Sequence, residues 1–282
     1  MKYKKNYYFE KNYNPRVSVP NFENYLDKAL MLSKKASEEL KGIENIKYGN
    51  GPLQNLDIFG ADKDKEKPIF IFLHGGYWRG LDKSYHTHMA KPFVKKGIMF
   101  VNVNYDLCPK VKVTTIEKQV TQAVIWIYKN IHKYGGIKTK IVICGHSAGA
   151  HLAALMVSKD WKKYNIKNRF FIASVLLSGI FDTELVLKLE VNNDIRMSIE
   201  EAKRLNPLNK HPNKNVKFLL SYGELEPELW KKQTIKYSKL LTTYKIPYSL
   251  VELKKQNHFS MINSITKDTD IFLKKIFEFF KE

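Results

Sequence analysis

Short apolar runs alternate with longer amphipathic stretches from about Asn55 onward, and few folds accommodate this alternation. Parallel strands need a crossover of a dozen or more residues, which is usually a helix. Several runs are apolar nearly throughout, as expected for strands covered on both faces. We therefore predict an α/β fold whose mainly parallel central sheet has helices on both faces, with strands at residues 56–59, 68–74, 98–104, 141–144, 173–178, 218–222 and 249–253.

Helical periodicity marks three longer stretches. Residues 116–134 place apolar side chains three or four positions apart, and residues 269–280 carry an apolar and aromatic stripe that we interpret as core. A third helix-like run, residues 25–40, belongs to a segment that precedes the alternation. We predict an N-terminal arm, residues 1–45, packed on an α/β domain of residues 46–282.

One segment, residues 183–216, interrupts the alternation. Asn192, Asn193, Pro207 and Pro212 punctuate short helical pieces there. We therefore expect this segment to form a small lid over the strand ends.

Composition limits the partners of the protein. The 282 residues suit one large domain, 44% of them are hydrophobic, and the formal net charge is +20. Lysines are spread along the whole chain as short pairs, without a basic block that contains interleaved aromatic residues. We interpret them as a solvated surface that helps modestly to attract an anionic substrate, and expect neither nucleic acid nor membrane as a partner.

Further features favour a cytoplasmic protein. The basic N-terminal residues are not followed by the apolar region and cleavage site of a signal peptide, and no apolar stretch approaches the roughly 18 residues of a membrane span. Cys108 and Cys144 are too few for a disulfide framework, and we expect two reduced thiols. The oligomeric state stays open, and a homo-oligomer is compatible with the sequence.

The stretch Gly145-His146-Ser147-Ala148-Gly149 matches G-x-S-x-G between a predicted strand and a predicted helix. In a nucleophile elbow, the turn holds the serine in a strained conformation, and glycines let the chain pass sharply. The alternative is an ordinary strand-to-helix turn that contains a small polar residue. Because the flanking pattern fits, we predict that Ser147 is a nucleophile.

A second stretch, His74-Gly75-Gly76-Tyr77-Trp78, follows a predicted strand where α/β hydrolases carry a loop that supplies oxyanion-hole amides. Backbone N–H groups are fixed donors that can face the charge developing on a carbonyl oxygen. We assign this role to the N–H groups of Gly76 and Tyr77, together with that of Ala148 after the nucleophile. A glycine turn explains either stretch singly, but explains the two together poorly.

A serine hydroxyl needs a base, and the base needs an acid that orients it. His258 is the predicted base because it follows the last strand, at the sheet edge expected for Ser147. The competing His86, His88, His132 and His211 lie in polar stretches, where we expect solvated surface roles. His86 and His88 lack nearby partners for zinc, and we predict no metal site.

The acid is expected between Ser147 and His258, which is the chain order of this fold. Glu226 follows the preceding strand and stands three residues past a glycine, far enough to turn toward the histidine. Glu224 and Glu228 are close rivals. Asp182, which follows the strand before that, is a fallback that otherwise serves as a helix cap or loop anchor.

Together these residues resemble the kynurenine formamidase branch of the α/β-hydrolase superfamily, in which HGGYW stands where related lipases and esterases carry HGGG. The likeness covers most of the chain. It is carried by HGGYW and GHSAG, and is supported by Tyr13-Asn14-Pro15-Arg16, Val103-Asn104-Tyr105 with Pro109, the SGIFD segment, and the region of Glu226 with Gln233.

The resemblance implies hydrolysis without a cofactor of N-formyl-kynurenine to kynurenine and formate, through a formyl-enzyme at Ser147, as part of tryptophan catabolism. It also implies that Trp78, Tyr77 and His146 line the substrate pocket, with buried packing as the alternative for Trp78 and Tyr77. The family often has Asp at the acid position where this chain offers Glu226, and Ala150 stands where related lipases often carry a third glycine.

Two other functions stay open at this point. Members of the family look able to cleave simple activated esters, so a general carboxylesterase of unknown substrate is compatible with the same residues. A non-catalytic binding protein of the same fold is less favoured, because this chain retains candidates for every member of the triad and of the oxyanion hole.

Overall fold

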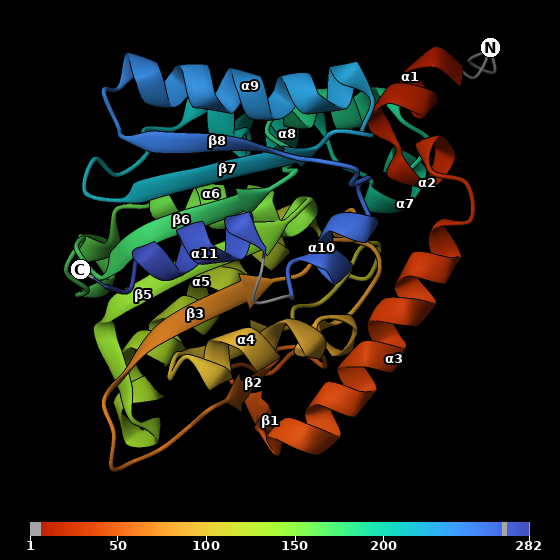
Figure 1. The fold of residues 1–282 in the computed structure, drawn as a ribbon. Helices are drawn as coiled ribbons and strands as arrows, with labels where there is room; N and C mark the ends of the chain where they lie inside the picture. The colour runs from red at the N-terminus through yellow and green to blue at the C-terminus, as the bar shows by residue number, and fades with distance from the viewer. Residues whose placement is uncertain (1–6, 267–269, 282) are drawn as a thin grey trace.

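The central sheet has eight strands. The computed structural model describes residues 7–266 and 270–281, and Figure 1 shows its arrangement. The strand order is β1-β2-β4-β3-β5-β6-β7-β8, in which β2 is antiparallel to both neighbours and the strands from β4 to β8 are parallel. All seven predicted strands are present. The bounds are β1 Ile43–Lys47, β2 Asn55–Phe59, β3 Lys67–Leu73, β4 Met99–Val103, β5 Gly136–His146, β6 Phe171–Leu177, β7 Lys217–Gly223 and β8 Tyr248–Leu253.

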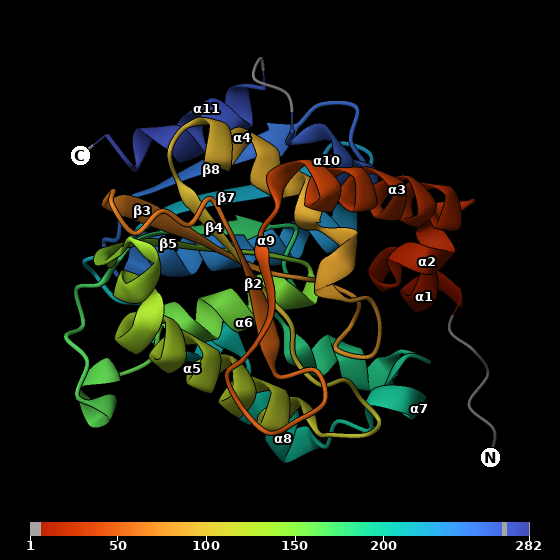
Figure 2. The same cartoon turned by 90° about the horizontal axis from the view of Figure 1, so that it is seen from below.

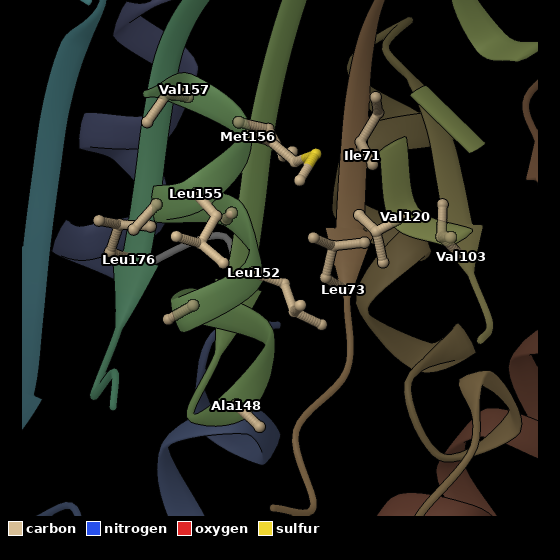
Figure 3. Close-up of a cluster of buried hydrophobic side chains, with 14 of the residues drawn as sticks. Ile71, Leu73, Val103, Val120, Ala148, Leu152, Leu155, Met156, Val157 and Leu176 are labelled. Atoms are coloured by element: carbon tan, nitrogen blue, oxygen red, sulfur yellow. The ribbon is translucent and has the colours of Figure 1, made fainter. Parts of the chain in front are cut away.

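Helices cover both faces of the sheet, as predicted. One face carries α5 (Val113–Asn130), α6 (Ala148–Val157) and α9 (Glu228–Thr243), and the other carries α4 (Ala90–Lys95), α10 (Ser260–Ser264) and α11 (Ile271–Glu278) (Figures 1 and 2). Figure 3 shows the first face, where side chains of β3 and β6 pack against α5 and α6. This double burial explains why the central strands read as continuous apolar runs.

The predicted helices differ from the observed ones mainly at their ends. The run 116–134 is α5 followed by a 3-10 turn, η3 (Ile131–Tyr134). The last helix begins at Ile271, and the predicted first residue, Thr269, lies outside the described residues. Phe272, Leu273 and Ile276 are buried, so the stripe on α11 belongs to the core.

Strand β1 was not predicted. It is an edge strand, and none of its residues is buried. Edge strands facing solvent need no apolar face, so their sequence carries little signal. The predicted boundary between residues 45 and 46 falls inside β1, and the division into arm and domain stays a prediction.

The N-terminal arm consists of α1 (Tyr7–Tyr13), α2 (Pro15–Ser18) and α3 (Phe22–Leu40). The buried residues of α3 are small, namely Ala29, Ser33 and Ala36, which lets α3 pack closely on η2 (Thr87–Met89) and α10. In Figures 1 and 2 the arm stands beyond the ends toward which the parallel strands point. It therefore lies beside the loops that carry the candidate residues.

The segment 183–216 forms the short helical pieces that its sequence predicts. These are η5 (Thr183–Lys188), α7 (Asn192–Ile195), α8 (Ile199–Arg204) and η6 (Pro207–Asn209). The backbone N–H of Glu190 donates to Glu10 Oε1 at 2.6 Å, so the segment contacts α1.

Two sequence expectations concern the surroundings of the protein. Within residues 7–266 and 270–281, no helix has the length and apolar character needed to cross a membrane. Cys108 and Cys144 are both free and buried, and burial raises the pKa of the Cys108 thiol to about 12. The predicted cytoplasmic location stays a prediction.

Candidate active site

The turn after β5 has the geometry of a nucleophile elbow. Ser147 has φ 56° and ψ −118°, a conformation that costs on the order of 1 to 3 kcal/mol in a non-glycine residue. Helix α6 begins at the next residue. A Cβ on Gly149 would lie 2.0 Å from the Leu73 carbonyl oxygen, and one on Gly145 would lie 2.1 Å from that of Gly149. Both glycines are therefore needed for the close approach of α6 to β3 and β5.

Three backbone N–H groups beside this turn are available to a ligand. The loop after β3 bends through left-handed conformations at Gly76, Tyr77 and Trp78, with φ of 105°, 50° and 56°. Among the described residues, the N–H groups of Gly76, Tyr77 and Ala148 form no hydrogen bond. The first N–H groups of a helix have no partner within the helix, which applies to Ala148.

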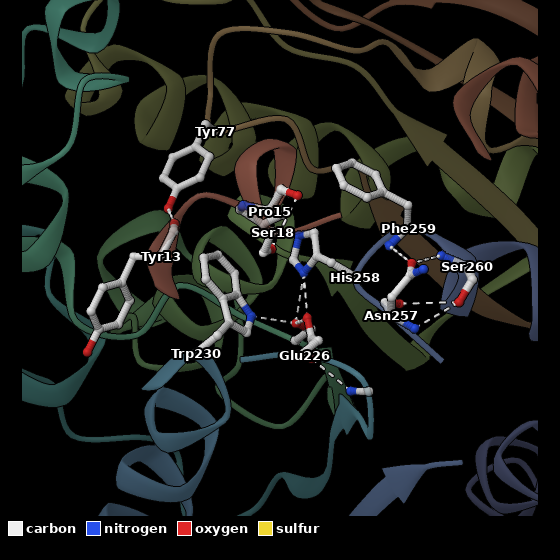
Figure 4. A network of polar contacts seen from close by, with 12 residues as sticks. Tyr13, Pro15, Ser18, Tyr77, Glu226, Trp230, Asn257, His258, Phe259 and Ser260 are labelled. Carbon is white, nitrogen blue, oxygen red and sulfur yellow. Dashed lines mark hydrogen bonds and ion pairs between the residues drawn. The ribbon is translucent and has the colours of Figure 1, made fainter. Parts of the chain in front are cut away.

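His258 and Glu226 form a buried pair. His258 Nδ1 lies 2.6 Å from Glu226 Oε1, and Glu226 Oε2 accepts a hydrogen bond of 2.8 Å from Gly223 N (Figure 4). Each of the two residues exposes 5% of its surface to solvent. With its proton on Nδ1, His258 donates to Glu226 and keeps Nε2 free to accept a proton.

The other candidate acids point elsewhere. The half-buried Glu224 accepts hydrogen bonds from Lys254 Nζ at 3.1 Å and Lys255 N at 2.8 Å, and the bond from Lys255 is the main cause of its lowered pKa. Glu228 forms an ion pair with Lys231, and Asp182 forms one of 3.2 Å with Lys236. Of the four carboxylates, only Glu226 contacts His258.

Two residues that the sequence analysis did not select hold this pair. Ser178 Oγ donates to Glu226 Oε1 and lies 3.0 Å from His258 Nδ1, while Trp230 Nε1 donates to Ser178 Oγ at 2.7 Å. The indole ring meets the imidazole edge-on, with 4.8 Å between centroids. Ser178 ends a predicted strand, which was a usable signal, whereas Trp230 is brought here only by the packing of α9.

A narrow cavity joins these parts. It has about 50 Å³ of accessible space, enough for a few water molecules. Ser147, His258, Gly76 and Tyr77 line it on the side of the sheet. The N-terminal arm forms the facing wall with Asn14, Pro15, Arg16, Tyr25, Leu26 and Ala29. No residue of the segment 183–216 belongs to the lining, so the described part of the chain covers these strand ends with the arm.

The structure separates the three residues expected to line the pocket. Tyr77 and His146 line the cavity, and the Tyr77 hydroxyl donates to the Tyr13 carbonyl oxygen of the arm. Burial, and then the nearby His258, hold the pKa of His146 well below its usual range. The expectation for Trp78 is corrected, because its side chain is fully buried and meets His151 edge-on at 4.9 Å. The left-handed bend of the loop turns this indole into the core.

The predicted surface roles of His86 and His88 are wrong. Both are buried beneath α3, where His88 Nδ1 lies 2.8 Å from Ser33 Oγ and His86 joins the cavity lining. Burial lowers the pKa of His86 strongly and that of His88 to about 4. In the described ranges no group of three or more metal-ligating side chains comes together.

An eight-stranded, mainly parallel sheet with a strained serine turn at the end of β5 defines the protein as an α/β hydrolase. The family model BD-FAE matches residues 56–197, about half of the chain. The chain is 31% identical over 254 residues to a kynurenine formamidase of Salmo salar, which covers 86% of this chain and 84% of the relative. A kynurenine formamidase of Danio rerio is 27% identical over 274 residues, which covers 95% of this chain and 92% of that relative. The chain therefore belongs to the kynurenine formamidase branch of the α/β hydrolases.

Solved structures agree with this family. A provisionally assigned thioesterase from Silicibacter sp. has a TM-score of 0.80 at 25% identity, covering 94% of this chain and 98% of that chain. An esterase from Pyrobaculum calidifontis has a TM-score of 0.71 at 20% identity, covering 86% of this chain and 87% of that chain. The protein is a hydrolase of the esterase type that cleaves formyl or acyl groups from a small molecule.

Proposed function

We propose that this hydrolase deformylates an aryl formamide, N-formyl-kynurenine, and that Ser147, His258 and Glu226 carry the reaction. The observation that carries the proposal is the buried His258–Glu226 pair, whose histidine lines the same cavity as a strained serine and as amides that have no partner. The relatives named kynurenine formamidase supply the substrate.

In the first half of the reaction, His258 Nε2 takes the proton of the Ser147 hydroxyl while Oγ attacks the formyl carbon. The developing oxyanion accepts hydrogen bonds from the N–H groups of Gly76, Tyr77 and Ala148, each worth roughly 3 kcal/mol in the transition state. His258 then protonates the aryl nitrogen, and the carbon–nitrogen bond breaks. The products of this half are the free arylamine and a formyl ester on Ser147.

In the second half, His258 takes a proton from water, which attacks the formyl ester. Formate leaves as the proton returns to Ser147 Oγ. Glu226 accepts the hydrogen bond from His258 Nδ1 and so holds the imidazole in the useful tautomer. Ser147 and His258 form no hydrogen bond with each other in the described structure, and contacts of this kind often tighten only when substrate is bound.

A general carboxylesterase is the second candidate, because esterases share this fold. The narrow cavity favours a small acyl group over a long one. A non-catalytic binding protein is not favoured. Backbone strain is kept at functional sites, and a binding role alone gives no reason for a strained serine beside the His258–Glu226 pair.

The test compares hydrolysis of N-formyl-L-kynurenine with that of p-nitrophenyl acetate, using wild type and Ser147→Ala. We expect fast deformylation that is lost in the variant. Ester cleavage alone, lost in the variant, would keep Ser147 as nucleophile and favour the carboxylesterase. Activity that persists in Ser147→Ala would overturn the assignment of the nucleophile.

A further inference from the structure

We infer that Arg16 selects the substrate by binding a carboxylate at the end remote from the formyl group. The inference rests on the proposed function, since it concerns the same cavity. It gives a role to the stretch Tyr13-Asn14-Pro15-Arg16, which the sequence analysis singled out and the triad chemistry leaves unused.

This stretch forms part of the cavity wall. Asn14, Pro15 and Arg16 line the cavity that holds Ser147 and His258. Asn14 Oδ1 accepts from Arg16 N at 3.2 Å, and Asn14 Nδ2 donates to Glu10 Oε2 at 2.8 Å. Pro15 is buried at the first position of α2. The backbone of Arg16 is therefore held in place by its neighbours.

Aromatic rings hold the side chain of Arg16 as well. Its guanidinium carbon lies 5.1 Å from the ring centroid of Phe22, which stacks on Phe259 at 5.4 Å. Phe259 in turn meets His258 edge-on at 5.5 Å. This row of rings connects the guanidinium to the catalytic base, and Figure 4 shows Pro15, Phe259 and His258 in the same region.

The charges at this end of the cavity are unequal. Arg79 also lines the cavity, but forms an ion pair with Asp194. Arg16 has no ion pair among the described residues, and Glu23 attracts it without reaching it. Burial, and then repulsion by Arg79, lower the pKa of Arg16. A carboxylate bound here would relieve this repulsion and would match the planar fork of a guanidinium.

The rest of the lining includes apolar surface, which Tyr25, Leu26, Leu81 and Ile262 provide. An aryl group suits this surface. The preferred substrate is therefore an aryl formamide that carries a carboxylate, and neutral esters lack the group that Arg16 recognises.

The experiment compares N-formyl-L-kynurenine with its primary carboxamide, which has nearly the same shape and an uncharged end. In Arg16→Gln we expect KM for the acid to rise about 10-fold or more, with kcat little changed and the carboxamide unaffected. Arg169→Gln is the matched control, because this exposed arginine lies just before β6, at the amino-terminal end of that strand and away from the cavity lining. It removes the same charge and is expected to leave both substrates unchanged.

A second measurement separates this inference from the proposed function. L-Kynurenine and its carboxamide are tested as inhibitors of p-nitrophenyl acetate hydrolysis, which requires no formamidase activity. We expect the acid to inhibit wild type more strongly than the carboxamide, and this difference to vanish in Arg16→Gln. Equal inhibition by both ligands in wild type, or an unchanged difference in Arg16→Gln, overturns the role of Arg16. If wild type leaves both formamides uncleaved, the proposed function fails, and the inhibition alone decides about Arg16.

Discussion

The two walls of the cavity differ in how they are built. The cavity floor, made of the strand-end loops that carry Ser147, Glu226 and His258, is almost fully buried, and its backbone is strained at the serine. The cavity roof is the part of the N-terminal arm that lines the cavity, Asn14, Pro15, Arg16, Tyr25, Leu26 and Ala29. The roof is more exposed, and the arm that carries it is tied to the rest of the protein through Tyr13, which accepts from Tyr77, and through Ser33, which contacts His88.

This difference separates chemistry from recognition. The floor is attached to a sheet that is buried on both faces, and such a sheet can sustain a strained turn and a buried hydrogen-bonded pair. The roof belongs to a peripheral layer whose side chains can change at small cost in stability. Changes to the floor should therefore affect every substrate alike, whereas changes to the roof should alter the choice between substrates.

The largest effect is expected at the centre of the floor. Ser147→Ala should lower kcat at least about 10³-fold for formamides and esters alike, because the variant has no nucleophile to attack the formyl or acyl carbon. Single-turnover assays of both substrates measure the loss, and an unchanged thermal midpoint serves as the folding control. A loss confined to one substrate class would contradict a shared nucleophile.

Acid should destabilise the folded protein, because of histidines that lie on and behind the floor. Burial lowers the pKa of five histidines on and behind the floor, whereas residues 7–40 contain none; the five are His74, His86, His88, His146 and His151. Below about pH 6.5 the unfolded chain binds more protons at these positions than the folded protein does. The free energy of unfolding is therefore highest above that pH, where these histidines are neutral in both states, and it falls as the pH falls. For His88, whose folded pKa is about 4, the loss from pH 7 to 5 is about 2 kcal/mol.

Urea denaturation at pH 7, 6 and 5 measures this effect. The free energy of unfolding of wild type should fall steeply across the series, and that of His88→Gln should fall less. His132→Gln removes an exposed histidine as a matched control and should retain the slope of wild type. Equal slopes in wild type and His88→Gln would contradict the burial argument.

A smaller effect is expected at Ser178, which contacts both members of the proposed acid–base pair. Ser178→Ala removes the hydroxyl shared by Glu226, His258 and Trp230, and should lower kcat roughly 10-fold with little change in KM. Ser221→Ala is the matched control, because Ser221 Oγ is buried on β7 without a hydrogen-bond partner in the described structure. Should both variants lose activity equally, the role of Ser178 is packing alone.

The smallest effect is expected where roof and floor meet. Tyr77→Phe removes the hydrogen bond to the Tyr13 carbonyl oxygen and should raise KM for the aryl formamide about two- to fivefold. Hydrogen exchange of the amides in α1 and α2 should quicken. Tyr244→Phe, just beyond the end of α9, should change neither. Unaltered exchange in Tyr77→Phe would show that other contacts hold the roof.

Much of the floor was predictable because its signals are local. The apolar runs predict the parallel strands, and Gly145 to Gly149 predict the elbow, since close approach at two positions allows only glycine. His258 was predictable from its place after the last strand. Glu226 stayed one of four candidates, because spacing alone does not say which carboxylate reaches the imidazole.

Tertiary packing alone decided the rest. Sequence shows neither that α3 buries His86 and His88 nor that Trp78 turns into the core, since both depend on contacts between distant segments. The same holds for Trp230, whose ring meets His258, and for Arg16, which is connected to His258 through Phe22 and Phe259. By itself the sequence determined the sheet, the serine turn and the family, because patterning and glycine requirements are properties of neighbouring residues. The assembly of the cavity was decided by the three-dimensional packing of the arm, because each of its contacts joins residues that the chain holds far apart.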